Sequence, residues 1–238
     1  MPIGIYAAAA GMAAQQTRID SLANDIANLN TTGYKSQRLA FHDLVYSLEQ
    51  GVEVGGGAST IDLGRSLEQG AVRQTGDPLN VAIEGPGYFR VRREDGTPAL
   101  TRDGSFRLDA SGELVISTGE RLDPPVRVPR GTDPSRITIS SGGAVSVAGK
   151  SVGKLTVVDV PAPSNLTSLG GNLFAASAAS GAPIATDVKV EQGSLEASNV
   201  DLARTFAGMI EAQRGYELTS RAIKTQDELL DVANQLVR

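Results

Sequence analysis

Six apolar residues near the carboxyl end of the chain recur at a strict spacing of seven. Seven residues correspond to two turns of an α-helix, so these side chains form one stripe. The stripe predicts a helix of about 36 residues and about 54 Å, capped by Ser198 or Asn199. A small domain is narrower than that, which counts against the alternative, an ordinary two-helix core. The stripe consists of Leu202, Met209, Tyr216, Ile223, Leu230 and Val237.

The amino end carries a second stripe, in which apolar residues lie seven apart and others follow them by three. Gln15 interrupts this series with a polar side chain. The stripe predicts a helix of roughly 26 residues that ends near Asn30, with Gly33 in the left-handed position of its C-cap. We expect the two terminal helices to pair as a coiled coil. The large residues of the second stripe are Ile5, Met12, Ile19, Leu22, Ile26 and Leu29.

Between the two stripes, short β-branched runs alternate with glycine and proline. Asp-Gly and Ser-Gly steps in "DGTPALTRDGSFRLDASGELV" predict strands joined by tight turns. The expected fold class is therefore α+β, with long terminal helices and an inserted antiparallel β domain. The predicted parts are an N-terminal helix with its exit segment at 1–45, an extended linker with a short strand or two at 46–78, the β domain at 79–187, and the C-terminal helix at 188–238.

Composition excludes several classes of protein. The formal net charge of −5 argues against a nucleic-acid-binding surface. The absence of cysteine excludes disulfides, thiolate metal sites and cysteine nucleophiles. No Lys or Arg precedes Arg18, so the basic start of a secretory signal is missing and we expect no cleaved signal. No apolar run approaches the ~18 residues of a membrane helix, so we expect no membrane insertion.

Candidates for catalysis or ligand binding are weak. The one histidine, His42, stands beside Asp43, but no serine or threonine motif points to it as a base, which favours a surface or interface role. "EGPGYF" lacks the third glycine of a dinucleotide fingerprint and reads as a bulge or tight turn. We expect no catalytic residue and no cofactor.

Two polar clusters leave alternatives open. Oxygen ligands for calcium are available in one, but their spacing departs from an EF-hand loop and hairpin turns explain them better. A basic stretch around three prolines is either a solvated loop or a contact for an acidic partner. The first cluster contains Asp103, Asp109, Ser111 and Glu113, and the second Arg121, Arg127, Arg130 and Arg136.

Both ends of the chain resemble the terminal signatures of the flagellar basal-body rod family, which includes rod, hook and hook-associated axial proteins. The segments are "SLANDIANLNTTGYK" and "SNVDLARTFAGMIEAQRGYE", and "NVAIEGPGYFRV" is similar to the β domain of rod proteins. The resemblance covers nearly the whole chain, with its motifs in the family's order. The matching residues are Asn24, Asn28, Gly33, Tyr34, Lys35, Ser198, Asn199, Val200, Gln213, Arg214, Tyr216 and Glu217.

Within the family, "QRLAFHDLVY" and the single β domain resemble the distal-rod branch most and the proximal-rod branch next. Three departures stand out. Asp25 replaces the family's second Asn, Arg204 or Thr205 stands where a Glu is usual, and Thr219 replaces an Asn. The linker after Tyr46 is also shorter than the distal-rod pattern.

The resemblance implies a structural subunit, without enzyme activity, that the flagellar type III apparatus exports. It implies polymerisation into a helical tubular rod that crosses the periplasm in the basal body and transmits torque. The implied partners are other copies of the chain, adjacent rod and hook proteins, the P- and L-ring proteins and the export apparatus. A periplasmic binding protein built on the β domain, and a closed coiled-coil oligomer, are the alternatives.

Overall fold

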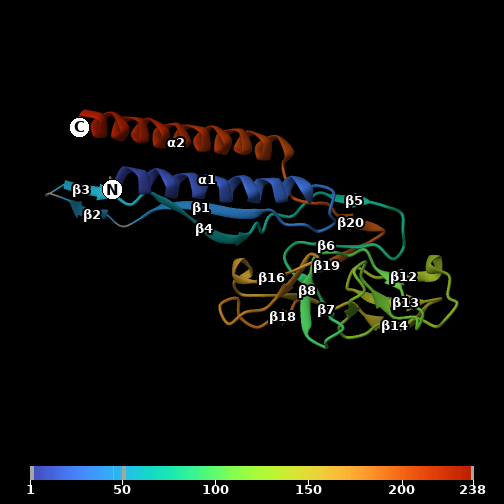
Figure 1. Cartoon of the computed structure of the whole chain (residues 1–238). Helices are drawn as coiled ribbons and strands as arrows, with labels where there is room; N and C mark the ends of the chain where they lie inside the picture. Colours follow the sequence, from blue (N-terminus) through green and yellow to red (C-terminus); the bar gives the residue numbers. More distant parts are fainter. Residues whose placement is uncertain (1–2, 45, 50–51, 237–238) are drawn as a thin grey trace. The chain divides into compact units, whose positions relative to one another are not determined.

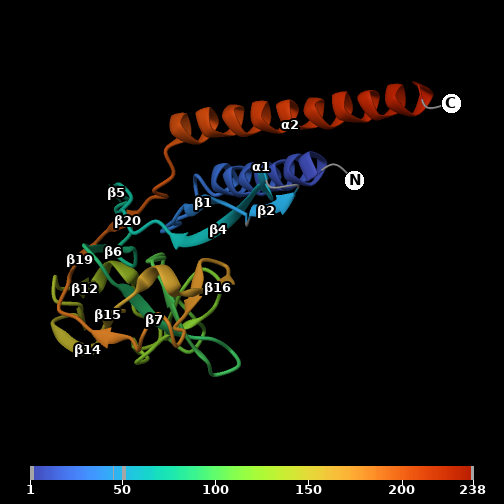
Figure 2. The ribbon, with the colours of Figure 1, turned by 90° about the vertical axis from the view of Figure 1, so that its left-hand side faces the viewer.

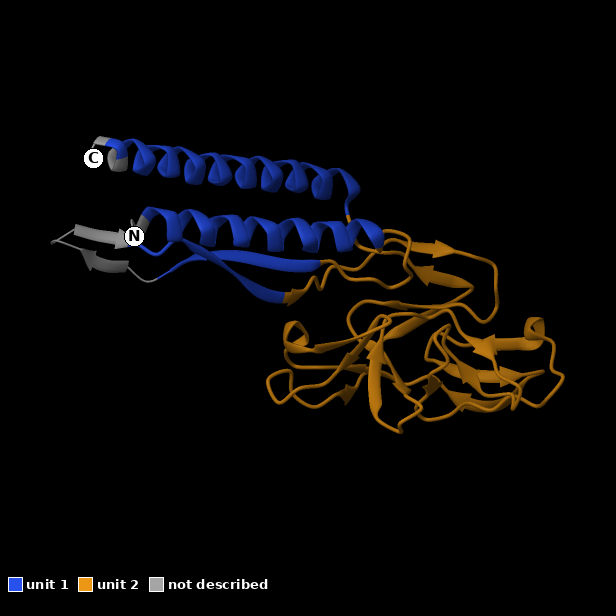
Figure 3. Cartoon of the chain, viewed as in Figure 1, with its two compact units in different colours: residues 1–27, 37–63, 201–238 blue, residues 28–36, 64–200 orange. Residues whose placement is uncertain are grey.

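The computed structural model describes residues 3–44, 46–49 and 52–236. The chain divides into two compact units (Figure 3). The helical unit comprises residues 1–27, 37–63 and 201–238, and the β unit comprises residues 28–36 and 64–200. The β unit thus takes in segments on both sides of the range 79–187.

Two long helices dominate the helical unit. Helix α1 (Ile3–Ala27) and helix α2 (Leu202–Leu236) lie side by side and run in opposite directions (Figures 1 and 2). Together with the antiparallel strands of the β unit, this confirms the expected α+β class. At 35 residues, α2 is about 52 Å long. Helix α1 ends three residues before the predicted Asn30, since Asn28 O accepts the Thr31 amide in a turn.

The amino end of α2 differs from the prediction. Asp201, not Ser198 or Asn199, caps the helix: its Oδ1 accepts the Arg204 amide at 3.1 Å, and its carbonyl accepts the Thr205 amide. A carboxylate there also favours the positive end of the helix dipole. The range 188–238, predicted as helical, begins instead with two strands, because Asn199 is held by partners in the β unit.

The range 46–78, predicted as a linker with a short strand or two, is more regular than expected. Strand β1 (Gln37–Asp43) pairs with β4 (Ala58–Arg65), and β2 (Tyr46–Glu49) with β3 (Val52–Gly55). Gly57, with φ +97°, precedes β4, and a Cβ there would lie 2.8 Å from the carbonyl oxygen of Ala7 in α1. This close approach requires glycine, and it places the strands along the helix.

Antiparallel sheets form the β unit. Among the described residues, a nine-stranded sheet has the order β16-β17-β8-β7-β11-β10-β9, with β15 and β18 joined at β7. Strands β12, β13 and β14 form a second sheet, and β6–β19 and β5–β20 form pairs. The strands are β5 (Val72–Gln74), β6 (Val81–Glu84), β7 (Tyr88–Arg92), β8 (Pro98–Thr101), β9 (Arg107–Leu108), β10 (Leu114–Val115), β11 (Arg121–Leu122), β12 (Ile137–Ile139), β13 (Ala144–Val147), β14 (Lys150–Lys154), β15 (Val157–Asp159), β16 (Thr167–Gly170), β17 (Leu173–Ala175), β18 (Ile184–Ala185), β19 (Lys189–Gln192) and β20 (Ser194–Glu196). Short 3₁₀ turns occur at Pro134–Arg136 and Pro163–Asn165.

The alternation of side chains in β7 shows how the main core forms. Phe89 and Val91 are fully buried on one face of the sheet, while Arg90 and Arg92 lie on the other. Phe89 meets Phe106 edge to face, with ring centroids 5.1 Å apart. Each large apolar side chain buried in this way contributes about 1.5–3 kcal/mol. A smaller cluster on the opposite face contains Tyr88, Leu100, Val158, Val160 and Phe174.

Within the described residues, neither helix has the length and apolar character that crossing a bilayer requires.

Candidate assembly interface

Glycines set the spacing of the α1–α2 pair. A Cβ on Gly215 would lie 2.9 Å from Nε2 of Gln15, so a larger residue there would require Gln15 to shift. Along the helix pair, the residue number in α1 rises as the number of its facing residue in α2 falls. The antiparallel register is therefore constant over the length of α1. The facing pairs are Gly4–Gln226, Gly11–Thr219, Gln15–Gly215 and Leu22–Gly208.

Most of the predicted stripe residues are half-buried on the helix pair. Leu202 and Leu230, at the two ends of the α2 stripe, are exposed instead, and Val237 lies outside the described residues. The stripe therefore faces α1 only along its middle. The half-buried members are Ile5, Met12, Ile19, Leu22, Ile26, Met209, Tyr216 and Ile223 on the helices, with Leu29 just after α1. Their part in assembly remains a prediction.

Small and polar residues occupy the most buried positions of the helix pair. Ala14 and Ala212 are buried, and so are Thr205 and Ser21. The predicted stripe contains large apolar residues and therefore omits these positions. The many alanines of α1 were a signal that the two helices approach closely. Gln15, which interrupts the predicted stripe, has a buried Oε1 without a hydrogen-bond partner among the described residues. An unmade hydrogen bond of this kind costs about 1–3 kcal/mol.

A second apolar surface on α2 is exposed. Leu218 is 66% exposed and Ile210 51% exposed. At 100° per residue, this surface lies away from the middle of the predicted stripe. We call it the outer face of α2; its large apolar residues are Leu202, Phe206, Ile210, Leu218, Leu229 and Val232.

The motif segment "TTGYK" forms part of the β unit, where three buried charges hold it. Lys35 Nζ lies 2.7 Å from Oε1 of Glu196 and donates to the Glu68 carbonyl at 2.6 Å. The other carboxylate oxygen of Glu196 lies 3.1 Å from Nε of Arg102, and all three side chains are almost completely buried. Burial lowers the pKa of the Lys35 ammonium below its usual value, and the hydrogen bond to Glu196 opposes that shift.

Neighbouring motif residues pack around the same point. Gly33, with φ +65°, donates its amide to the Glu196 carbonyl at 2.8 Å, and a Cβ there would lie 2.6 Å from the Arg102 carbonyl carbon. Tyr34 is buried, and its hydroxyl accepts a hydrogen bond from Arg65 at 3.1 Å. The geometry explains why glycine, tyrosine and lysine occur in this order.

Asn199 ties the two motifs together. Its Oδ1 accepts the Ser36 amide at 2.8 Å, its Nδ2 donates to the Glu68 carbonyl at 3.0 Å, and its own amide donates to Tyr34 O. Ser198 Oγ accepts the Val200 amide, and Val200 is buried. These hydrogen bonds hold the segment after α1 against the segment before α2. They are structural contacts and not ligand contacts.

The remaining motif residues lie elsewhere. Asn24 is exposed on α1, and Asn28 Oδ1 accepts a hydrogen bond from Thr31 after the helix ends. Gln213, Arg214 and Glu217 are exposed on α2. Their exposure leaves them available to other molecules.

The weak candidates for chemistry have structural partners or surface positions. His42 is exposed on β1. The carbonyls of Gly85 and Gly87 in "EGPGYF" accept hydrogen bonds from Arg102. The proposed calcium ligands form turns: Asp109 accepts the amides of Ser111 and Glu113. No group of three or more His, Asp or Glu side chains suited to a metal ion occurs in the part of the chain that the structure describes.

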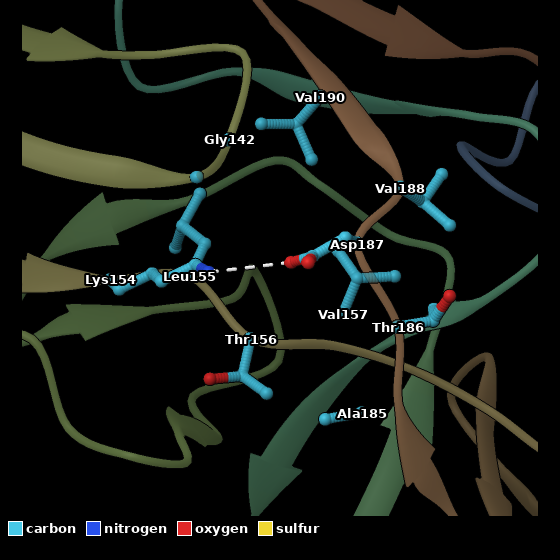
Figure 4. A pocket seen from close by; sticks show the side chains of 11 residues that line it. Gly142, Lys154, Leu155, Thr156, Val157, Ala185, Thr186, Asp187, Val188 and Val190 are labelled. Carbon is cyan, nitrogen blue, oxygen red and sulfur yellow. Dashed lines mark ion pairs between the residues drawn. The ribbon is translucent and has the colours of Figure 1, made fainter.

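A groove of about 320 Å³ opens in the β unit between β14 and the segment that leads from β18 to β19 (Figure 4). Lys154 and Asp187 are its titratable residues, and they face each other at 3.7 Å. Its other lining residues are small or aliphatic. No nucleophile with a neighbouring base is present among the residues that line it.

Three protein-family profiles match successive parts of the chain. The profile described as flagella basal body rod protein matches residues 5–35, and the FlgE/F/G D1 domain of flagellar hook proteins matches residues 82–147. The profile of the C-terminal part of flagellar basal body rod FlgEFG proteins matches residues 191–236. The first and third cover α1 with the motif segment and α2.

Curated relatives match over nearly their full length. The flagellar basal-body rod protein FlgG of Borreliella burgdorferi is 38% identical, over 98% of each chain. FlgG of Agrobacterium fabrum is 36% identical, over 96% of this chain and 97% of that one. FlgF of Caulobacter vibrioides is 32% identical, over 92% of each. The chain therefore belongs to the FlgG family of flagellar basal-body rod proteins, the structural components of the rod.

Proposed function

We propose that this protein is a distal-rod subunit that polymerises through its helical unit into a helical tubular filament. The observation that carries the proposal is the apolar surface on two sides of α2. One side packs on α1, and the outer face, with Phe206, Ile210 and Leu218, is exposed. Monomers rarely expose large apolar patches unless another molecule covers them.

Burial of the outer face supplies a driving force for assembly. A large apolar side chain that becomes fully buried contributes about 1.5–3 kcal/mol, and the outer face has several such side chains along one helix. In an open polymer, unlike surfaces of successive copies meet head to tail, so growth continues without closure. Torque then passes through many moderate contacts in parallel, and no chemical step is involved.

The buried charges around the motif segment support a mechanical role for the β unit. Lys35, Glu196 and Asn199 join the segment after α1 to the segment before α2 at a buried point of the β unit. A junction of this kind transmits force between the chain's two terminal segments and the sheets without relying on one strand. Its removal is therefore expected to weaken the β unit itself.

Family membership supports a proposal for the location and the partners. We propose that the protein works in the periplasm-spanning rod after export through the flagellar type III apparatus. Its neighbours are then other copies, adjacent rod and hook proteins, and the P- and L-ring proteins. The lack of cysteine suits a chain that passes an export channel unfolded and works in an oxidising compartment.

Distal-rod identity rests on the comparisons. The FlgG relatives from Borreliella and Agrobacterium are more similar to this chain than the FlgF relative from Caulobacter. By sequence pattern, the shorter linker after Tyr46 sets this chain apart within the branch, together with the departures at Asp25, at Arg204 or Thr205, and at Thr219.

Replacement of Ile210 by Glu tests the proposed polymerisation. Ile210 is half exposed, so Ile210→Glu is expected to leave the monomer folded while a charge blocks burial of the outer face. We expect the variant to stay monomeric in sedimentation, at protein concentrations where the unmodified chain forms polymers, and to fail to restore swimming.

The matched control is Ile210→Leu, which keeps an apolar side chain of the same size at that position. It should assemble normally, with the same helical circular dichroism. Polymers of Ile210→Glu equal to those of Ile210→Leu would contradict a role for the outer face.

A further inference from the structure

A row that includes three arginines crosses part of one face of the nine-stranded sheet. Arg92 of β7 is the direct partner of Arg121 in β11, which pairs with Val115 of β10, and Val115 pairs with Arg107 of β9. Directly paired residues point to the same face of a sheet, and neighbouring strands lie about 4.8 Å apart. The four side chains therefore stand side by side, on the face opposite Phe89 and Val91.

Two carboxylates anchor this row: Asp123 is largely buried and Glu113 is almost completely buried. Asp123 lies between Arg90 and Arg92, at 3.1 Å from Nε of the first and 3.3 Å from Nη2 of the second. Each guanidinium group offers five N–H donors, so one carboxylate leaves most of them unused. The Asp123 carboxylate thus orients two arginines while their outer edges stay open.

Glu113 repeats the arrangement two strands away. It is almost completely buried, 2.7 Å from Nε of Arg127 and 3.3 Å from Nη1 of Arg121. The side chains of Arg127 and Arg121 remain 75% and 62% exposed. Planar, oriented guanidinium groups bind carboxylates in a bidentate manner. We call Arg90, Arg92, Arg107, Arg121 and Arg127, with Asp123 and Glu113, the arginine face.

The arginine face carries a net charge of +3 in an acidic protein. The β unit contains fifteen Lys or Arg and fifteen Asp or Glu, so its remaining residues sum to −3. The helical unit contains seven basic and twelve acidic residues, a net −5. Outside the arginine face, therefore, both units present an excess of carboxylates.

We propose that the arginine face binds carboxylates on the surface of a second copy of this chain. The charge complementarity carries the choice of partner: apart from this face, a copy carries a net negative charge on both units, and the face itself is not self-complementary. A contact between unlike surfaces is the kind that an open filament uses. The inference rests on the proposed polymerisation and names a polar contact that accompanies the apolar one.

Arg107 offers the cleanest test. It is exposed and has no ion-pair partner among the described residues, so its replacement leaves no buried carboxylate unpaired. Replacement of Arg121 or Arg127 would instead remove a partner of Glu113 and destabilise the fold. Arg130 is the matched control, because it is also an exposed arginine without an ion pair there and stands on no strand of this sheet.

We expect Arg107→Glu to raise the critical concentration for polymerisation of the full-length chain about tenfold, which corresponds to about 1.4 kcal/mol. Arg130→Glu, with the same change in net charge, should polymerise like the unmodified chain, and Arg107→Lys should retain most of the effect of arginine. Salt screens contacts between exposed charges, and the Debye length falls from roughly 14 Å at 50 mM NaCl to roughly 4 Å at 500 mM. The difference in critical concentration between the two Glu variants should therefore shrink over this range.

Two results would overturn the inference. Equal critical concentrations for Arg107→Glu and Arg130→Glu would show that copies do not meet at this face. Normal polymers of Arg107→Glu combined with lost swimming would assign the face to a different acidic partner. Failure of the unmodified chain to polymerise under all conditions would instead contradict the proposed function, which separates the two ideas.

Discussion

At the scale of single residues, the β unit depends on three buried charges that contact one another. Lys35, Arg102 and Glu196 give a net positive charge at a site where all three side chains are almost completely buried, and the contacts among them and with nearby carbonyls offset the loss of hydration. Glu196 is the common partner. Its Oε1 accepts both Lys35 and the Gly70 amide, so the carboxylate connects three separate segments of chain.

Glu196→Gln should therefore destabilise the β unit strongly. The substitution leaves Lys35 and Arg102 buried without a countercharge, and we expect a loss of about 3–5 kcal/mol in the free energy of unfolding. Urea denaturation followed by far-ultraviolet circular dichroism measures it. Glu84→Gln, at an exposed position of β6, is the control and should change stability by less than about 0.5 kcal/mol. Equal stability of the two variants would contradict a structural role for the charge cluster.

Sequence reasoning found one of these three charges. The motif "TTGYK" marks Gly33 and Lys35, because their spacing and residue types repeat a family pattern. Arg102 and Glu196 gave no signal, since their contacts join segments far apart in the sequence. Strand β20 also reverses the usual alternation: Ser194 and Glu196 are buried, while Leu195 is only half-buried. A period-two reading places Leu195 in the core and Glu196 in solvent.

At the scale of elements, the helices were predictable and their ends were not. The spacing of seven located α1 and α2 because periodicity persists over many turns. The N-cap of α2 was predicted at the wrong residue because Ser, Asn and Asp all serve as N-caps. Asn199 is held by tertiary contacts instead, and this leaves Asp201 as the cap. The strands β2 to β4 lie in a glycine-rich stretch whose pattern is weak, so the sequence indicated a linker.

Two truncations should separate the roles of α1 and the segment after it. Deletion of residues 1–27 removes a part of the helical unit only, so the β unit should remain folded and resistant to protease. Deletion of residues 1–36 also removes Tyr34 and Lys35, and leaves Glu196 without one partner. We expect a clearly lower melting temperature for the second truncation, measured by differential scanning calorimetry.

The comparison of the truncations has a sharp negative outcome. Equal melting temperatures would mean that segment 28–36 adds nothing to the β unit. Loss of all protease resistance after deletion of residues 1–27 would mean that the two units do not fold separately.

At the scale of the whole molecule, we propose a subunit that is incomplete alone. The outer face of α2 and the arginine face are both exposed, one apolar and one charged, and both are suited to contacts with unlike surfaces of other copies. The motifs of the sequence led us to expect no catalytic residue, and this stays a prediction. The arginine face escaped sequence reasoning, which grouped Arg121 and Arg127 with Arg130 and Arg136 along the chain, whereas strand pairing groups them with Arg92 and Arg107.

Sedimentation velocity of the full-length chain over a wide range of concentrations tests the central claim most directly. We predict species that grow without an upper limit as concentration rises, because each added copy presents the same unlike surfaces to the next. A rigid monomer at every concentration, or one oligomer of fixed size, would contradict the account.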